Sequence, residues 1–169
     1  AGDADDRVVE YYTFPDDPGY NTTVEPSGKR AGRGVVTRVP MRTLDTLIGR
    51  QDVDVMKIDV EGAEVQALEG ARGILEHSRP TVMFESTPDP YPQSLARAAV
   101  LFDWIDRRGY VVLLPDRLAH LDEGLTSSGF VDSHLHPRRS TNFFAVAKEK
   151  RVELRVRVRE ILGLDRKPY

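Results

Sequence analysis

The chain has 169 residues, of which 40% are hydrophobic and 30% charged, and a formal net charge of -3, a composition that indicates one globular domain and excludes a disordered chain. No uncharged apolar stretch approaches the ~20 residues of a membrane span, and 27 acidic against 24 basic residues argue against a nonspecific nucleic-acid binder. The chain has no cysteine and an acidic start, so the sequence predicts no disulfides, no thiolate chemistry, no secretory signal and a cytoplasmic location.

The N-terminal third predicts two strands separated by a long loop. Residues 8–14 are rich in β-branched and aromatic side chains, and residues 35–39 form a second apolar run, which is typical of strands. The loop at 15–34 is rich in proline and glycine and too long for a tight turn, which favours a functional or mobile segment. Thr43 then caps a short predicted helix that ends at Ile48.

The rest of the chain alternates strands with helices. Apolar runs predict further strands at 53–60, 81–84, 110–114 and 142–147. Apolar spacings of three and four predict helices after residue 61 and at 94–108, whereas 115–140 reads as a loop. This alternation predicts an α/β fold with a mainly parallel sheet.

We divide the chain into one domain at 1–148 and a C-terminal segment at 149–169. The second segment is basic and amphipathic, and its apolar spacing fits a helix better than a strand. Its arginines are interpreted as a solvated basic face.

Acidic residues cluster where the carboxyl ends of two strands are expected. They are Asp59, Glu61, Glu64 and Glu85. Ligands of an open parallel sheet bind beyond the strand ends, and consecutive strands are usually neighbours, so these carboxylates are expected to converge. Such a group can accept a proton from a hydroxyl, hold a divalent metal or bind a small ligand.

Some of these carboxylates also have a structural explanation. Glu61 and Glu64 lie in the first turn of a helix, where the dipole favours acidic residues, and Glu64 is better explained as a stabiliser there than as a catalyst. Asp59 and Glu85 each follow an apolar strand that is expected to lie deep. A carboxylate in such a place is costly without a partner or a function.

Two histidines lie in the loop before the last predicted strand. His134 and His136 are two residues apart and on an extended segment would face the same side, but without further ligands they are better read as solvated, and we assign no metal site to them. Because the flanking strands look like a terminal pair, this loop is expected near the active end, so either histidine is a candidate proton acceptor. Phosphate-loop, serine-hydrolase and zinc-protease motifs are missing.

Several motifs together resemble one known family. Residues 39–45 read VPMRTLD, residues 57–64 read KIDVEGAE, residues 68–71 read LEGA, and RP at 79–80 is followed by FE at 84–85. With these motifs in this order, the chain over about residues 8–148 resembles the FkbM family of S-adenosylmethionine-dependent methyltransferases.

This resemblance implies a fold, a cofactor and a reaction. The fold is a Rossmann-like class I methyltransferase sheet, mainly parallel with a terminal antiparallel strand, here without its first strands. The cofactor is S-adenosylmethionine, and the reaction is O-methylation of a hydroxyl on a natural product or saccharide. Asp59 and Glu61 would contact the cofactor, and Asp59, Glu61, Glu85 or His134 would take the hydroxyl proton. The candidate contacts for the acceptor are Tyr20, Asn21 and Glu85.

The chain departs from the family at its N-terminus. Members of the family have a first strand with a glycine-rich turn and a second strand ending in an acidic residue, and the sequence contains neither before residue 8. We therefore expect the chain to correspond to the carboxyl-terminal part of such an enzyme, with an upstream segment or a second chain completing the fold.

Two other functions remain open at this stage. One is a divalent-metal hydrolase built on Asp59, Glu61 and Glu85. The other is a non-catalytic binding or assembly partner, whose open strand edges another chain would cover. For the methyltransferase, the expected partner is a small-molecule hydroxyl acceptor, with no nucleic acid and no membrane span.

Overall fold

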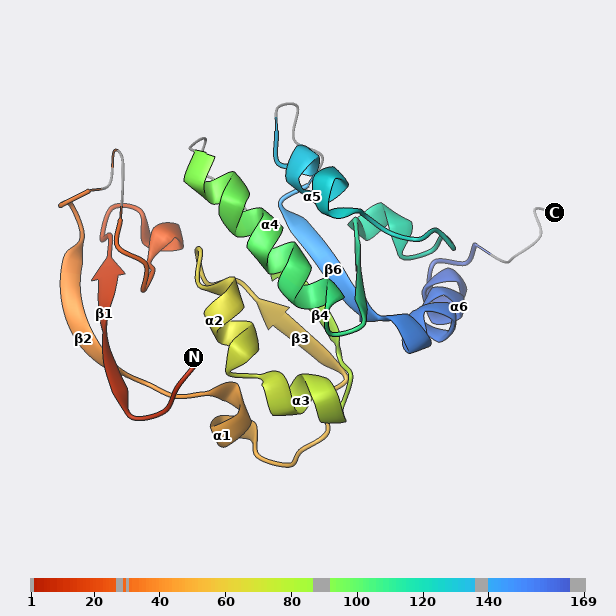
Figure 1. Cartoon of the computed structure of the whole chain (residues 1–169), viewed down its shortest axis with the longest axis horizontal. Coiled ribbons are helices and arrows are strands. Elements are labelled where there is room, and N and C mark those ends of the chain that lie inside the picture. The colour runs from red at the N-terminus through yellow and green to blue at the C-terminus, as the bar shows by residue number, and fades with distance from the viewer. Residues whose placement is uncertain (1, 27–28, 30, 87–91, 136–139, 165–169) are drawn as a thin grey trace. The chain divides into compact units, whose positions relative to one another are not determined.

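The computed structural model describes residues 2–26, 29, 31–86, 92–135 and 140–164, and Figure 1 labels their elements. The chain forms two compact units, which are described separately: the first comprises Ala1–Pro80 and Glu85–Thr87, and the second Thr81–Phe84 and Pro88–Tyr169. Within the described residues, no helix combines the length and the apolar character needed to cross a membrane.

The first unit begins with strands and continues with short helices. Its elements are β1 (Arg7–Thr13), the 3-10 turn η1 (Pro18–Tyr20), β2 (Val35–Met41), α1 (Leu44–Ile48), β3 (Val55–Ile58), α2 (Glu64–Glu69) and α3 (Arg72–His77).

The second unit contains most of the longer elements. They are β4 (Thr81–Glu85, whose last residue belongs to the first unit), α4 (Pro92–Asp106), β5 (Tyr110–Leu113), η3 (Pro115–Arg117), α5 (Ser127–Ser133), β6 (Asn142–Ala147), η4 (Lys148–Lys150) and α6 (Arg151–Ile161). The α/β character predicted from the sequence is confirmed by these elements.

Strands β1 and β2 form an antiparallel two-stranded sheet. Their register runs from Arg7 opposite Met41 to Thr13 opposite Val35. The second strand is therefore two residues longer than predicted, because β1 pairs with it along its whole length. It includes Pro40, which is compatible with a strand at the edge of a sheet because proline has no N–H to donate.

The predicted single helix after residue 61 is divided into α2 and α3. Gly70 lies at the division, where a Cβ atom would stand 1.9 Å from the Gly2 carbonyl oxygen. The Gly2 N–H in turn donates to the Arg42 carbonyl at 3.0 Å. The N-terminal segment therefore packs directly against the backbone between the two helices, and only glycine fits at position 70.

Asp45 explains how α3 begins. Its carboxylate accepts hydrogen bonds from the N–H groups of Gly73 at 2.8 Å and Ile74 at 2.9 Å. These N–H groups lie at the N-terminus of a helix and have no partner within the helix itself. A side chain from α1 thus caps a helix that lies 28 residues further along the chain. The cap of α1 by Thr43, which accepts from the Thr46 N–H at 3.1 Å, is confirmed.

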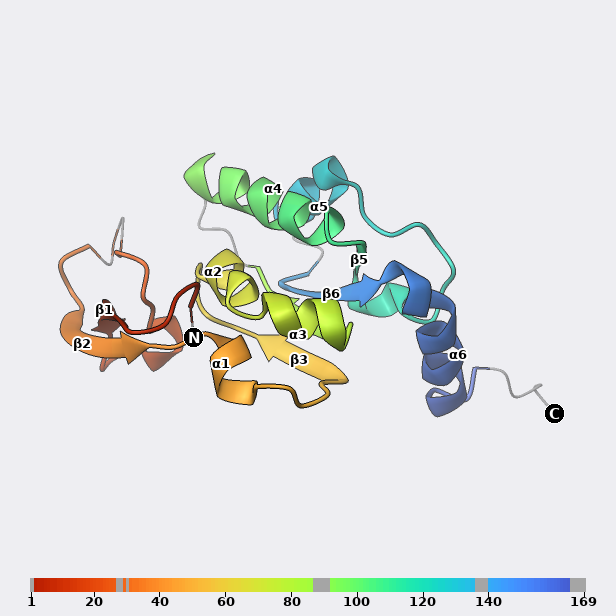
Figure 2. The same cartoon turned by 60° about the horizontal axis from the view of Figure 1, so that its bottom comes forward.

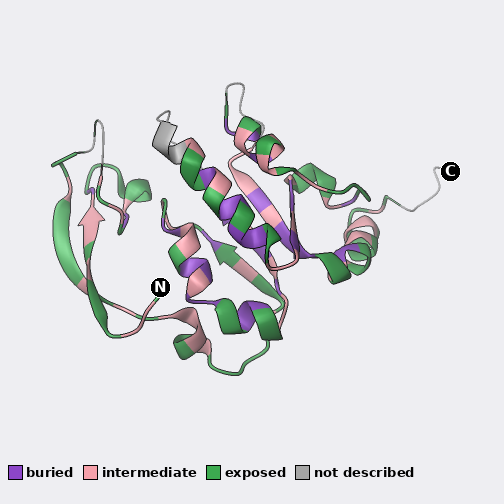
Figure 3. Ribbon diagram, in the orientation of Figure 1, coloured by how far each residue is buried: buried purple, intermediate pink, exposed green. Residues whose placement is uncertain are grey.

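In the second unit, β4, β6 and β5 are neighbours in that order. Strands β5 and β6 are antiparallel, with Tyr110 opposite Ala147 and Leu113 opposite Phe144, so the expected antiparallel terminal strand is confirmed. Helices α4 and α5 lie side by side in both views (Figures 1 and 2). Buried and exposed positions alternate along α4 (Figure 3), as expected of a helix with one face on the core.

Helix α5 lies in a stretch that the sequence analysis predicts as a loop, so that prediction is wrong. Thr126 caps it by accepting from the Gly129 N–H at 3.1 Å. Phe130, one turn further on, is fully buried and packs edge-on against Phe143, with ring centroids 4.7 Å apart. The helix is short and has a single large aromatic anchor, which leaves no apolar period for the sequence to display.

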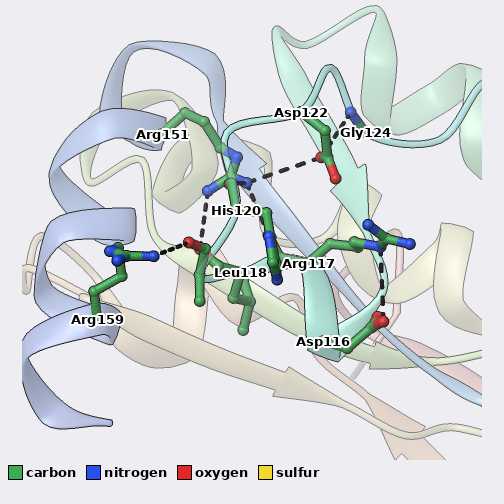
Figure 4. Close-up of polar contacts among 9 residues, drawn as sticks. Asp116, Arg117, Leu118, His120, Asp122, Gly124, Arg151 and Arg159 are labelled. Carbon is green, nitrogen blue, oxygen red and sulfur yellow. Dashed lines mark hydrogen bonds and ion pairs between the residues drawn. The ribbon is translucent and has the colours of Figure 1, made fainter. Parts of the chain in front are cut away.

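Helix α6 is held to the second unit by Arg151 (Figure 4). Its guanidinium donates to the carbonyls of Leu118 at 3.2 Å, Arg117 at 3.0 Å and His120, and lies 4.0 Å from the Asp122 carboxylate. The residue is only 6% exposed, and this burial lowers the pKa of its guanidinium. The interpretation of the α6 arginines as a solvated face is therefore wrong for Arg151.

We expect Asp45→Ala to lower the free energy of unfolding by about 1–2 kcal/mol, because two helix-terminal N–H groups lose their acceptor. The matched control is Asp52→Ala, which removes an exposed carboxylate that only approaches His77, at 3.3 Å; its effect should be below about 0.5 kcal/mol. Urea unfolding monitored by circular dichroism measures both values. Equal losses in the two variants would contradict the capping role.

Arg151→Ala should cost about 2–3 kcal/mol, because several backbone carbonyls lose a charged donor at once. Arg157, which is exposed on the same helix, provides the control Arg157→Ala, with an expected change near zero. Thermal unfolding compares the variants, and amide hydrogen exchange within α6 should accelerate in Arg151→Ala alone. Unchanged hydrogen exchange in α6 would show that the hydrogen bonds of Arg151 do not hold the helix in place.

Candidate functional site

The candidate site is built on the turn between β3 and α2 in the first unit. Asp59 follows β3 directly, and its Oδ2 accepts from the Lys57 Nζ at 2.6 Å. Residues two apart in a strand lie on the same face, which explains this pair. The Asp59 side chain is 36% exposed and Val55 is 68% exposed. The expectation that Asp59 lies deep is therefore wrong, and the cost of its charge is offset by Lys57 and by water.

The backbone of this turn has an uncommon conformation. Glu61 has φ 48° and Gly62 has φ 96°. Positive φ costs glycine little, but for a residue with a side chain it costs about 1–3 kcal/mol and is found mainly where the surrounding structure enforces it. Here the Glu61 carbonyl accepts from the Thr22 hydroxyl at 2.9 Å. A hydrogen bond from another segment of the chain therefore stabilises this strained conformation.

Glu64 is the carboxylate of the turn whose pKa is shifted from its ordinary value. Its Oε1 accepts from the Gly62 N–H at 2.9 Å, so the side chain folds back over the turn. Burial raises the pKa of the Glu64 carboxyl, the hydrogen bond from Gly62 lowers it, and the charges of Asp59 and Glu85 raise it further. The charges of Asp59 and Glu85 thus act on Glu64, and the predicted convergence of all four carboxylates stays a prediction.

The sequence suggested only a helix-stabilising role for Glu64. Its position in a first helical turn offered a sufficient structural reason for an acidic residue there. The available signal was that Glu64 follows a glycine by two residues, a spacing at which a side chain can reach back to the backbone of a turn. Glu61, by contrast, contributes a carbonyl to the observed contacts, and its half-buried side chain keeps its predicted cofactor role as a prediction.

The loop after β1 carries the predicted acceptor contacts. Tyr20 ends η1 and is exposed. Asn21 follows it, and its Oδ1 accepts from the Phe14 N–H at 2.9 Å. This hydrogen bond means that Asn21 helps to close the loop. Tyr20, in contrast, is exposed. Both remain predictions as acceptor contacts.

His134 lies in the second unit, inside an aromatic core. It is 4% exposed, follows the last residue of α5, and its Nδ1 lies 2.6 Å from the Phe130 carbonyl. Its ring stacks on Phe143 at 5.4 Å and meets Phe130 edge-on at 4.6 Å. The reading of His134 as a solvated loop residue is therefore wrong, and its role as a proton acceptor stays a prediction. His136 lies outside the described residues.

No group of three or more His, Asp or Glu side chains within the described ranges is arranged to hold a metal ion. Asp59, Glu61 and Glu85 were the proposed ligands of a metal hydrolase. That alternative has no support in the part of the chain that the structure describes.

Comparison with known proteins identifies the family. The family model of the methyltransferase FkbM domain matches residues 2–112, which is more than half of the chain and includes the β3–α2 turn and Glu85. The chain belongs to the FkbM methyltransferase family. The matched residues form the N-terminal part of this chain. No curated protein and no solved structure matches the chain.

Glu64→Gln should stabilise this FkbM domain more at neutral than at acidic pH. A carboxyl whose folded-state pKa lies above its ordinary value of 4.5 holds its proton in the folded protein after the unfolded chain has lost it, so stability falls as the pH rises through this window. Glutamine keeps an oxygen for the Gly62 N–H and removes the charge. The melting temperatures of variant and wild type, measured at about pH 4 and about pH 7.5, test the sign.

The control is Glu76→Gln on the exposed side of α3. Its effect on the melting temperature should be nearly the same at both pH values. If the Glu64 and Glu76 variants had the same pH dependence, the grouping of the carboxylates would be contradicted.

Proposed function

We propose that this chain acts as an S-adenosylmethionine-dependent O-methyltransferase on a hydroxyl of a natural product or saccharide, with a Rossmann-like arrangement of its sheet. The observation that carries the proposal is the β3–α2 turn. It contains the KIDVEGAE motif of the family, and its carboxylates share one electrostatic group with Glu85. The membership in a methyltransferase family supplies the reaction class.

The chemistry of the turn fits the cationic end of the cofactor. Burial is the main cause that raises the pKa of Glu64, and the charges of Asp59 and Glu85 raise it further. A ligand with an ammonium group and a sulfonium would relieve this repulsion. Asp59 and Glu61 are the residues that would hold it. When bound, S-adenosylmethionine supplies an electrophilic methyl group.

The residues of the chain have to position the acceptor and remove its proton. Glu85 is the preferred proton acceptor, since its half-buried carboxylate ends β4 and interacts with Glu64. Glu85 would take the hydroxyl proton as the acceptor oxygen bonds to the methyl carbon, and the bond from that carbon to the cofactor sulfur would break, which would leave S-adenosylhomocysteine. Asp59 is the second candidate base, although its pairing with Lys57 makes it better suited to hold positive charge.

The loop after β1 is proposed to contact the acceptor. Tyr20 is its exposed aromatic residue, and a ring with a hydroxyl suits the face of a sugar or the edge of a polycyclic natural product. Asn21 can offer its side-chain N–H₂ while its oxygen accepts from Phe14. A small-molecule acceptor therefore matches the chemistry of this loop.

Cofactor binding is tested by saturation-transfer NMR, which detects weak ligands. We expect transfer to the methyl and adenine protons of S-adenosylmethionine, competition by S-adenosylhomocysteine, and at least about a threefold loss in Asp59→Asn, since one charge-assisted contact is removed. Glu76→Gln should match the wild type. Absence of transfer at millimolar cofactor, or equal transfer in Asp59→Asn, would refute the proposal.

A further inference from the structure

Thr22 connects the two segments to which the proposed function assigns different tasks. Its hydroxyl donates to the Glu61 carbonyl at 2.9 Å and accepts from the Val24 N–H at 3.0 Å. The residue is 9% exposed, so water competes little for these bonds. One side chain thus joins the loop after β1 to the β3–α2 turn, across 39 residues of sequence.

The position of Thr22 is fixed by its own backbone. Its N–H donates to the Tyr12 carbonyl at 3.1 Å, and its carbonyl accepts from the Tyr12 N–H at 2.9 Å. This isolated bridge attaches the end of the loop to the outer edge of β1. The Thr22 hydroxyl is therefore held by the sheet rather than by a flexible segment, and it offers the turn a rigid support.

The loop that precedes Thr22 is itself closed by local bonds. Asn21 accepts from the Phe14 N–H, the Asp17 N–H donates to the Phe14 carbonyl at 2.9 Å, and the Tyr20 N–H donates to the Asp17 carbonyl at 3.1 Å. Phe14 is buried beneath it. These hydrogen bonds join Tyr20, Asp17, Phe14 and Asn21, and Asn21 is the residue that directly precedes Thr22.

The contact falls on the strained residue of the turn. Glu61 is the non-glycine residue with φ 48°, and the next residue, Gly62, presents its N–H to Glu64. A bond to the Glu61 carbonyl fixes the peptide plane between Glu61 and Gly62, because carbonyl and N–H share that plane. The direction of the Gly62 N–H, and with it the Glu64 side chain, thus depends on the Thr22 hydroxyl.

We propose that Thr22 is a positioning residue that fixes the Glu61–Gly62 peptide plane. It thereby holds the loop that carries Tyr20 in a fixed position relative to the turn that carries the carboxylates. The functional part of this inference, that acceptor contact on the loop is coupled to carboxylate placement, rests on the proposed methyltransferase function. The structural part does not.

The test compares Thr22→Val, which has nearly the same shape without the hydroxyl, with Thr22→Ser, which keeps the hydroxyl. Residue-resolved amide hydrogen exchange is measured in the full chain without cofactor. The Val24 N–H should exchange faster in Thr22→Val because it loses its acceptor. If Thr22 positions the turn, the Gly62 N–H should also exchange about tenfold faster, and Thr22→Ser should restore both rates.

The Leu75 N–H, which donates to the Ala71 carbonyl at 2.9 Å, serves as the internal reference for the same unit. Global loss of stability raises the Gly62 and Leu75 rates together, so the ratio of the two isolates the turn. An increased ratio in Thr22→Val supports the inference. An unchanged ratio overturns it, whatever the overall stability of the variant, and reduces Thr22 to a local loop residue.

Saturation transfer to S-adenosylmethionine on the same samples separates this inference from the proposed function. Absence of transfer in the wild type refutes the methyltransferase proposal and leaves the exchange result standing. With transfer in the wild type, we expect a loss in Thr22→Val and recovery in Thr22→Ser. Equal transfer in all three proteins would overturn the functional coupling.

Discussion

The candidate site depends on one peptide plane, the one between Glu61 and Gly62. Its two residues take positive φ in succession, and this orientation sends a carbonyl toward Thr22 and an N–H toward Glu64. Without such a turn, the chain would run from β3 into α2 with its acidic side chains in the usual dispersed arrangement of a first helical turn. The conformation of this turn and the burial of Glu64 together set the environment of the carboxylates.

Regular elements with a local signal were predictable from the sequence. The strand at 142–147 has its predicted bounds, and α4 begins two residues before the predicted start at 94. Thr43 caps α1 because the bond closes within four residues. In each case, periodicity or a short-range bond decides the structure, and both can be read from neighbouring residues.

Contacts between distant segments could not be predicted in the same way. Asp45 lies in the first turn of α1, but the helix it caps begins 27 residues later, at Arg72. Arg151 looked like one member of a solvated basic face, yet it is buried against backbone carbonyls. His134 lies between two phenylalanines, Phe130 of α5 and Phe143 of β6. The partners in these cases are set by the tertiary fold, and charge or spacing alone does not reveal them.

The candidate carboxylates illustrate both outcomes. Their convergence is predicted by the rule that ligands gather beyond strand ends, which depends only on topology. Their individual environments did not follow, since Asp59 is more exposed than its apolar neighbours suggested and Glu64 is more perturbed than a first-turn residue should be. A sequence pattern thus pointed to these residues, whereas the burial that raises the pKa of Glu64 depends on the tertiary fold.

The hydrogen bonds of Arg151 affect which amino-acid substitutions this chain can accept. The guanidinium binds main-chain oxygens of residues 117, 118 and 120, and every amino acid supplies such an oxygen. Substitutions of the side chains in that segment therefore leave the attachment of α6 chemically intact, provided that the backbone keeps its path. The loop therefore tolerates many side-chain substitutions. The helix, in contrast, must retain its arginine at position 151.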